Sequence, residues 1–362
     1  VCQASHRLKY GPCKCRSGIL VAPTRPQAIE KGLAAEGLLA WLLTSKYVDH
    51  LPLYRLEGIL ARHGADISRQ TLCDWVASCA DALNPIYEHL RRTIVTVDYL
   101  QTDDTPVTVL GEGGGSLTGR LWVYLDPLGK RVFFDATPTR GRDGPERVLK
   151  DFKGYLQADA YSAYDALYRT GRLVEVGCWA HARRKFFDTR EQDPEAMKVL
   201  ALIGKLYEVE RQAEGLSHEE RRVLRLEKSM PILEEIDRVR GELSRTALPK
   251  SGLGEALRYL HNQREALGRY LLDGRLKPDN NGAENQLRVV AVGRKNWLFA
   301  GSQDGASRAA LIYTLAQGCK LAGVEPFRYF KDVLLRVATH PASRIEELTP
   351  TGWAAAFAPA AA

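Results

Sequence analysis

The chain has 362 residues, of which 45% are hydrophobic and 26% are charged, an ordinary balance for a globular protein of two or three domains. No apolar run approaches the roughly 18 residues of a membrane-spanning helix, and seven cysteines with no visible signal peptide do not suggest a disulfide scaffold. We therefore expect a cytoplasmic protein without a membrane partner. The net charge of +7 favours a polyanionic partner such as nucleic acid.

The first segment, residues 1–25, is basic and contains clustered cysteine and histidine. Cys13 and Cys15 form a C-x-C pair, whereas a zinc knuckle usually has C-x₂-C. The chain opens on Val1 rather than Met, so we interpret this segment as the basic remnant of a zinc-binding segment. Zn²⁺ would bind here if further ligands complete the site. The alternative is a basic, mobile arm.

Hydrophobic spacing predicts helices throughout residues 26–92. A leucine-rich run ends at Gly64, and Ser68 is suited to cap the next helix. This pattern is typical of a helix-turn-helix, in which Arg69 and Gln70 would open the second helix and contact DNA bases. A plain helical hairpin is the alternative.

From residue 93 the hydrophobic period changes to two, which predicts strands. We expect a first strand that ends at Asp103 and continues at 107–110, followed by a hairpin of 121–125 with 131–134. A helix is expected next at 146–152. Strands at 154–158 and 173–176 follow, and a helix comes after the second of them. This order predicts an α/β fold, a mixed sheet with helices on its faces, and it matches the ribonuclease-H-like order.

We assign that core to residues 93–190 and 276–338. Between them, residues 191–275 carry amphipathic helical patterns without site chemistry and predict an all-helical insertion, which could hold DNA or a second subunit. Residues 339–362 form a C-terminal tail, and its alanine- and proline-rich end after Trp353 is expected to be disordered.

Three acidic residues stand in contexts that packing does not explain. Asp103 and Asp159 end strand-like runs, and Glu284 opens a helix-like run after a loop of Asn and Gly. If the two strands are neighbours, these carboxylates converge and can hold two Mg²⁺ (or Mn²⁺) ions about 4 Å apart, as phosphodiester chemistry requires. We assign the bridging role to Asp103. A single Asp at a strand end is usually a cap, so the hypothesis depends on all three. Asp104 would point to the opposite face.

Cys178 and His181 form a C-x₂-H pair at the start of a predicted helix. A zinc site needs two more ligands, and a buried Cys with a hydrogen-bonded His near the active site is the structural alternative. Further basic residues are suited to contact a DNA backbone, although a solvated face is the default interpretation for them: Arg183, Arg184, Lys185, Arg288, Arg294 and Lys295.

Six motifs together resemble the DDE transposases of the insertion sequence 66 family: TDDTPV, GYLQADAYSAY, CWAHARRKFF, DGRLKPDNNGAENQLR, GRKNWLFAGSQDGA and AGVEPFRYFKDVLLRV. The similarity covers nearly the whole chain. It implies that Asp103, Asp159 and Glu284 are the catalytic acids, and that residues 1–25 are the end of a zinc-binding segment. It also implies a bacterial cytoplasmic enzyme that cuts the ends of an insertion sequence and transfers the strands to target DNA.

The resemblance implies further partners: DNA terminal inverted repeats, target DNA, other copies of this chain assembled on DNA, and other element-encoded proteins. The chain departs from the family pattern at Asp104, where Glu is common, at Ala160, where Gly is common, and at Asn285, where Arg is common. Two alternatives to a transposase follow. One is a truncated, catalytically inactive transposase-derived DNA-binding protein, and the other is a nuclease of the same fold.

Overall fold

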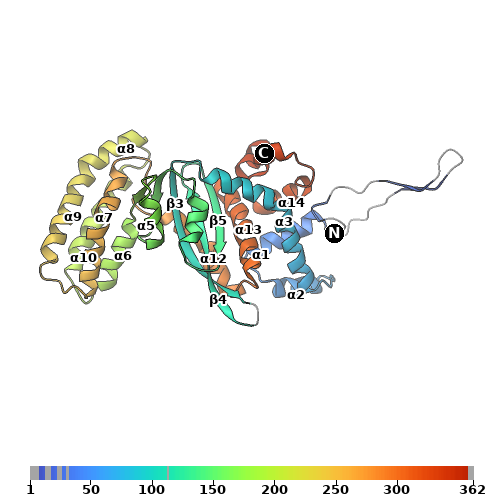
Figure 1. Ribbon diagram of the computed structural model, residues 1–362, viewed down its shortest axis with the longest axis horizontal. Helices are drawn as coiled ribbons and strands as arrows, with labels where there is room; N and C mark the ends of the chain where they lie inside the picture. The colour runs from blue at the N-terminus through green and yellow to red at the C-terminus, as the bar shows by residue number, and fades with distance from the viewer. Residues whose placement is uncertain (1–7, 13–17, 23–26, 30–31, 112–113, 358–362) are drawn as a thin grey trace. The chain divides into compact units, whose positions relative to one another are not determined.

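The computed structural model describes residues 8–12, 18–22, 27–29, 32–111 and 114–357 (Figure 1). The chain divides into two compact units. The first comprises Val1–Leu90, Val292–Ala300 and Asp304–Ala362, and the second comprises Arg91–Ala291 and Gly301–Gln303.

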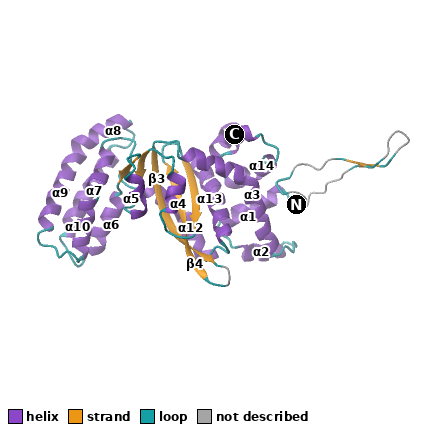
Figure 2. Ribbon diagram, in the orientation of Figure 1, coloured by secondary structure: helices purple, strands orange, loops and turns teal. Residues whose placement is uncertain are grey.

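The first unit is almost entirely helical (Figure 2). Its elements are the short strands β1 (Lys9–Tyr10) and β2 (Leu20–Val21), the helices α1 (Glu36–Tyr47) and α2 (Leu53–Arg62), most of α3 (Arg69–Ile94), the end of α12 (Asn281–Trp297), α13 (Gln303–Ala322), α14 (Pro326–Arg336), a 3₁₀ segment (Ala342–Leu348) and α15 (Pro350–Ala356). Strands β1 and β2 pair antiparallel, but Cys13 and Cys15 lie outside the described residues, so the zinc prediction stays a prediction.

The start of α3 agrees with the predicted capping. The Ser68 hydroxyl accepts a hydrogen bond from the Thr71 backbone N–H at 3.2 Å, and the helix begins at Arg69. The end of α3 differs from the prediction. The sequence pattern predicts a strand from residue 93, but the helix continues to Ile94. Leu90 and Ile94 are buried four residues apart on α3, so the helical period continues where the local sequence alternates.

The C-terminal segment is more ordered than predicted. Thr349 caps α15 by accepting a hydrogen bond from the Gly352 N–H at 3.1 Å. The buried Trp353 ring donates to Asp332 on α14 at 2.7 Å and packs edge-on against Tyr329. These contacts hold the helix to Ala356, so the expected disorder directly after Trp353 is wrong. Residues 358–362 lie outside the described part of the chain.

The second unit contains a five-stranded mixed sheet, in agreement with the predicted α/β class. Its strands and flanking helices are β3 (Tyr99–Leu110), β4 (Ser116–Asp126), β5 (Arg131–Thr137), α4 (Asp143–Leu149), β6 (Gly154–Gln157), a 3₁₀ turn (Ser162–Tyr164), α5 (Asp165–Tyr168) and β7 (Leu173–Val176). The strand order is β5-β4-β3-β6-β7. Strand β4 runs antiparallel to both β3 and β5, whereas β6 runs parallel to both β3 and β7.

The predicted hairpin is present as β4 and β5, but the predicted end of the first strand at Asp103 is wrong. Strand β3 continues to Leu110 because β4 pairs with it from Gln101 to Leu110. On its other side, β3 pairs with β6 only as far as Gln101 opposite Gln157. Asp103 therefore lies within a strand, just beyond the point where the neighbouring strand β6 ends.

Helices follow the sheet, in agreement with the helical character predicted for residues 191–275. They are α6 (Trp179–Thr189), α7 (Ala196–Gln212), α8 (His218–Leu224), a π-helical turn (Arg225–Ser229), α9 (Met230–Leu243), α10 (Gly252–Asn262), α11 (Arg264–Gly268) and a 3₁₀ turn (Arg269–Leu271). Helix α6 packs against α7 and α10, and α9 packs against α7 (Figure 1). Phe186, Leu206 and Leu257 share one core with Tyr99 and Val176 of the sheet, so these helices extend the core of the sheet.

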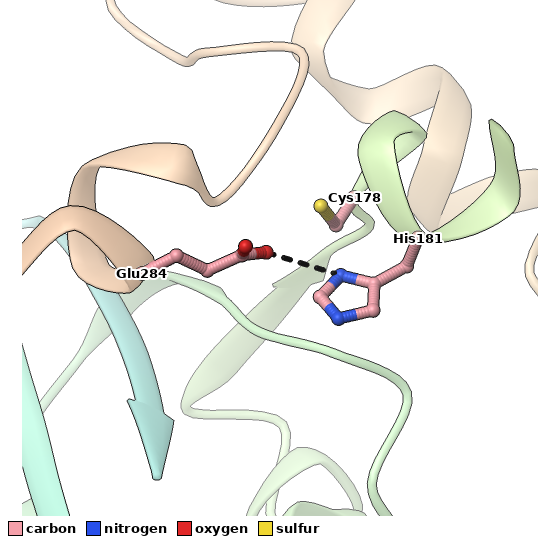
Figure 3. A group of neighbouring side chains, drawn as sticks. All are labelled: Cys178, His181 and Glu284. Atoms are coloured by element: carbon pink, nitrogen blue, oxygen red, sulfur yellow. Dashed lines mark ion pairs between the residues drawn. The ribbon is translucent and has the colours of Figure 1, made fainter. Parts of the chain in front are cut away.

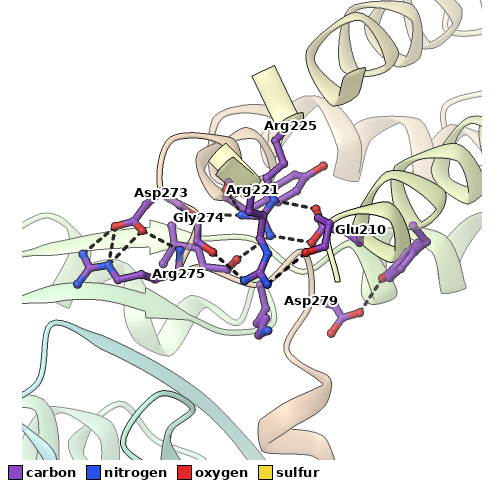
Figure 4. A network of polar contacts seen from close by, with 12 residues as sticks. Glu210, Arg221, Arg225, Asp273, Gly274, Arg275 and Asp279 are labelled. Carbon is purple, nitrogen blue, oxygen red and sulfur yellow. Dashed lines mark hydrogen bonds and ion pairs between the residues drawn. The ribbon is translucent and has the colours of Figure 1, made fainter. Parts of the chain in front are cut away.

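A buried arginine joins these helices to the segment that precedes α12 (Figure 4). Arg225 is fully buried, and its guanidinium donates twice to Glu210, each time at 2.7 Å. It also donates to the backbone carbonyls of Tyr270, Asp273 and Leu276 at 2.8, 3.2 and 3.0 Å. One side chain therefore links α7 to three points of the 270–276 segment.

Candidate active site

Two of the three predicted acids are aligned by strand register. Strands β3 and β6 are parallel, and Gln101 is paired with Gln157. Asp103 and Asp159 each follow one of these glutamines by two residues. Because side chains alternate along a strand, Asp103 lies on the same face of the sheet as Gln101. The sequence expectation that the two acids come from neighbouring strands therefore agrees with the structure.

A buried polar network brings in the third acid. Tyr99, Gln101 and Gln157 are at most 1% exposed, and the Tyr99 hydroxyl donates to Gln157 at 2.6 Å. The Gln157 amide donates to the Lys277 carbonyl at 2.8 Å, and the Gln101 amide donates to the Asp279 carbonyl at 3.0 Å. Buried amides need such partners, so this network fastens the segment before α12 to β3 and β6.

Two further residues of this segment, Asn280 and Gly282, complete its attachment to the sheet. The Asn280 side chain is buried and donates to the Thr102 carbonyl, next to Asp103, at 2.8 Å. At Gly282 a Cβ atom would lie 2.2 Å from Oε1 of Gln101, so a larger residue would have to displace this buried amide. Glu284 consequently projects from the first turn of α12 into the same region as Asp103.

Asp159 and Glu284 both act electrostatically on Asp103. The pKa of Asp103 is raised to about 7, mainly by burial and also by the nearby charges of Asp159, Asp104 and Glu284, against one hydrogen bond from the Asp104 N–H. Burial also raises the pKa of Asp159, while His181 and Arg140 oppose that rise. Two carboxylates from distant parts of the chain thus lie close enough to act on the mostly buried Asp103.

Asp104 differs from Asp103 in having its own cations. Its side chain is 2% exposed and accepts hydrogen bonds from Arg120 at 3.0 Å and Arg140 at 2.9 Å. Arg140 also lies 3.4 Å from Asp159 and stacks on Tyr161, with 3.8 Å to the ring centroid. Asp104 is therefore neutralised by arginines. Sequence analysis missed Arg140, and no motif around it signalled this role.

The predicted Cys–His pair lies beside Glu284 (Figure 3). Cys178 is fully buried, burial raises its pKa to about 12, and its Sγ accepts a hydrogen bond from the Asn280 N–H at 3.3 Å. His181 Nδ1 lies 3.7 Å from Glu284 Oε1, and the Arg184 guanidinium lies 3.9 Å from Glu284 Oε2. The predicted buried Cys beside the active site agrees with the structure. His181 Nδ1 has no hydrogen-bond partner among the described residues, so the hydrogen-bonded histidine stays a prediction.

The other predicted DNA contacts of the second unit are Arg183 and Lys185 on α6 and Arg288 on α12. Arg183 lies over the Phe187 ring at 5.4 Å, and Lys185 lies over the Tyr259 ring at 5.1 Å. Arg288 is exposed on α12, one turn after Glu284. Contact of these cations with DNA stays a prediction.

The remaining predicted contacts belong to the first unit. Arg69 and Gln70 are exposed in the first turn of α3, where the Gln70 amide donates to Asp74 at 2.9 Å. Arg294 and Lys295 lie in the last turn of α12. Their position at helix termini is compatible with DNA contact, which stays a prediction.

Family comparison identifies the class of protein. The description "Transposase IS66 family" matches residues 31–308, and "IS66 C-terminal element" matches residues 314–351. The chain therefore belongs to the IS66 transposase family, as its motifs predicted. Among the described residues, no helix is long and apolar enough to cross a membrane.

Relatives that are similar over most of this chain occur in Sinorhizobium fredii (strain NBRC 101917 / NGR234). "Uncharacterized protein y4qI" is 35% identical over 96% of this chain and 67% of its own length. "Uncharacterized protein y4hP" is 33% identical over 96% and 67%, and "Uncharacterized protein y4jD" is 30% identical over 96% and 72%.

The crowding of carboxylates predicts a stability effect without DNA. Asp103 has a pKa of about 7 in the fold against 3.8 ordinarily, so the stability it contributes when protonated is lost as pH rises through 7. Asp103→Asn should raise the melting temperature by about 2–8 °C at pH 8 in EDTA, and by less at pH 5. Thermal unfolding measures this, with the exposed Asp188→Asn as the matched control. A lower melting temperature for Asp103→Asn at pH 8 would contradict the crowding.

Proposed function

We propose that this protein is a DDE transposase, which cleaves DNA at the ends of an insertion sequence and joins the ends to target DNA with Mg²⁺ or Mn²⁺. The observation that supports this most is the convergence of Asp103, Asp159 and Glu284 on one site from β3, the end of β6 and α12. The strand order β5-β4-β3-β6-β7, with β4 antiparallel, further supports a ribonuclease-H-like core.

The donor set suits magnesium, which prefers carboxylate oxygens. Asp103 would be shared by two ions, because Asp159 and Glu284 both act on it electrostatically, and these two acids would each hold one ion. Glu284 Oε1 is buried without a hydrogen-bond partner in the described structure, as expected for an atom that ligates a cation. When bound, the ions activate the attacking hydroxyl and stabilise the leaving oxygen.

The chain's own cations have a separate part. Arg184 lies beside Glu284 and is 62% exposed, so its free donors can contact a DNA phosphate while the carboxylate stays oriented. Arg140 fixes Asp104 and Asp159 relative to each other. In the first unit, α2 and α3 are candidates for reading the terminal inverted repeats. Two DNA ends must be joined in concert, so we expect several copies of the chain, with or without other element-encoded proteins, on DNA.

A strand-transfer assay with labelled terminal-repeat DNA, target plasmid and Mg²⁺ tests the proposal. Joining of the 3′ ends to the plasmid, only with the repeat sequence present, is the expected result. Binding without joining would instead indicate a transposase-derived DNA-binding protein. Cleavage without preference for the repeat ends would indicate a nuclease.

A further inference from the structure

A second donor set overlaps the acids and differs from them in chemistry. Cys178, His181 and Glu284 each offer one ligand atom, and these atoms all lie within 4.8 Å of one another (Figure 3). Thiolate and imidazole are ligands for zinc, whereas magnesium prefers oxygen alone. From these residues we propose that Cys178, His181 and Glu284 bind a thiophilic divalent cation of the zinc class, and that this cation takes Glu284 away from magnesium. The second part rests on the proposed function.

The ligand atoms are available and suitably spaced. His181 Nδ1 and Glu284 Oε1 are buried, lack hydrogen-bond partners in the described chain, and lie 3.7 Å apart. That distance is too long for a hydrogen bond. It is close to the roughly 3.4 Å that separates two ligands bound at about 2.1 Å in a tetrahedral zinc site. An ion between them would satisfy both atoms.

Burial raises the pKa of Cys178, but two features of its surroundings oppose this effect and favour the thiolate once a cation is present. Cys178 precedes the first residue of α6, so its Sγ lies at the N-terminal end of an 11-residue helix. The Asn280 N–H also donates to Sγ at 3.3 Å. Asn280 also donates to the Thr102 carbonyl of β3, so one residue of the segment before Glu284 connects the sulfur to that strand. Three protein ligands leave a fourth position for water.

The site predicts regulation by competition. Glu284 cannot serve the thiophilic ion at Oε1 and remain fully available to magnesium, so the two occupancies oppose each other. Zinc should therefore inhibit strand transfer at concentrations far below that of Mg²⁺. Loss of Cys178 should relieve the inhibition, because the remaining ligands no longer favour zinc.

Cobalt absorption tests the site without any DNA. The full chain is prepared with Cys2, Cys13, Cys15 and Cys73 replaced by Ser, which leaves Cys79, Cys178 and Cys319. Titration with Co²⁺ should give a thiolate-to-cobalt absorption band at one equivalent, and Zn²⁺ should displace it. Cys178→Ser and His181→Asn should each weaken Co²⁺ binding at least tenfold. Cys319→Ser, which removes another fully buried thiol, should not change it.

Circular dichroism and thermal unfolding establish that each variant is folded. His181→Asn alters a partly exposed side chain, which the fold should tolerate more readily than a change at the fully buried Cys178. A cobalt band that persists in Cys178→Ser or in His181→Asn, or that never forms in the parent, overturns the proposal. Absence of strand transfer with a normal cobalt band would overturn the proposed function alone. Normal strand transfer without a cobalt band would overturn the thiophilic site alone.

Discussion

Replacing Asp103 with Asn should lower the rate of strand transfer by about 10³-fold or more, while the affinity for terminal-repeat DNA stays within about threefold. The substitution keeps the shape of the side chain and removes the charge of the carboxylate that both other acids approach. Measured joining rates and a DNA-binding isotherm on the same preparation separate catalysis from binding. The higher melting temperature expected for this variant excludes unfolding as the cause.

The neighbouring residue provides the sharpest control. Asp104→Asn removes a charge one position away, but that charge is already paired with Arg120 and Arg140. This variant should be less stable, because a nearly buried ion pair loses one partner, and it should retain measurable Mg²⁺-dependent joining. Asp188→Asn, on the surface of α6, should behave as the unchanged protein. If Asp104→Asn were inactive and Asp103→Asn active, the ligand would be Asp104.

The three acids could be predicted because their signals are local. A carboxylate after an apolar run, as at Asp159, or after a turn of Asn and Gly, as at Glu284, is visible in a few residues of sequence. The boundaries of β3 could not be predicted in this way. They depend on β4, which pairs along the whole of β3 and extends it beyond Asp103.

The means by which the acids meet is the part that sequence analysis missed. Gln101 and Gln157 are polar residues that directly follow Tyr-Leu in a strand, each two positions before an acid, and that pattern is a usable signal. Their partners are backbone carbonyls of 277 and 279, more than a hundred residues away in the chain. Hydrogen bonds to backbone carry no residue-type signature, so no local pattern identifies the partner.

The helical region shows the same limit. Its amphipathic pattern predicted helices over 191–275, but one arginine among many could not be recognised as buried. Arg225 and Arg238 occur in similar charged sequence, yet the first is fully buried and the second lies on the surface of α9, where it pairs with Glu235 and Glu242. The difference comes from the packing of α7 against the π-helical turn that contains Arg225, which is a tertiary effect.

This pair of arginines gives the second large expected effect. Arg225→Met should lower the free energy of unfolding by about 3–5 kcal/mol, because it leaves the carboxylate of Glu210 without its cation and three carbonyls without donors. Arg238→Met removes the same charge from an exposed position and should shift the denaturation midpoint little. Urea unfolding followed by circular dichroism measures both.

A double variant separates the two causes of this loss of stability. Arg225→Met with Glu210→Leu removes the stranded carboxylate as well, and should recover part of the stability. Recovery should be incomplete, because the carbonyls of Tyr270, Asp273 and Leu276 still lack donors. Equal midpoints for Arg225→Met and Arg238→Met would show that the buried guanidinium contributes no more than a surface ion pair.

The same substitution should reach the active site. The last carbonyl that Arg225 binds is that of Leu276. The next residue, Lys277, begins the segment that Gln157 and Gln101 bind and that leads to Glu284. Loosening one end of this segment should displace Glu284 from Asp103, and small displacements of a catalytic group cost large factors in rate. Arg225→Met should therefore lower strand transfer about tenfold or more at a temperature where the protein is still folded. Arg238→Met should leave the rate of strand transfer unchanged. This difference would show that the buried arginine of the helical region helps to position Glu284.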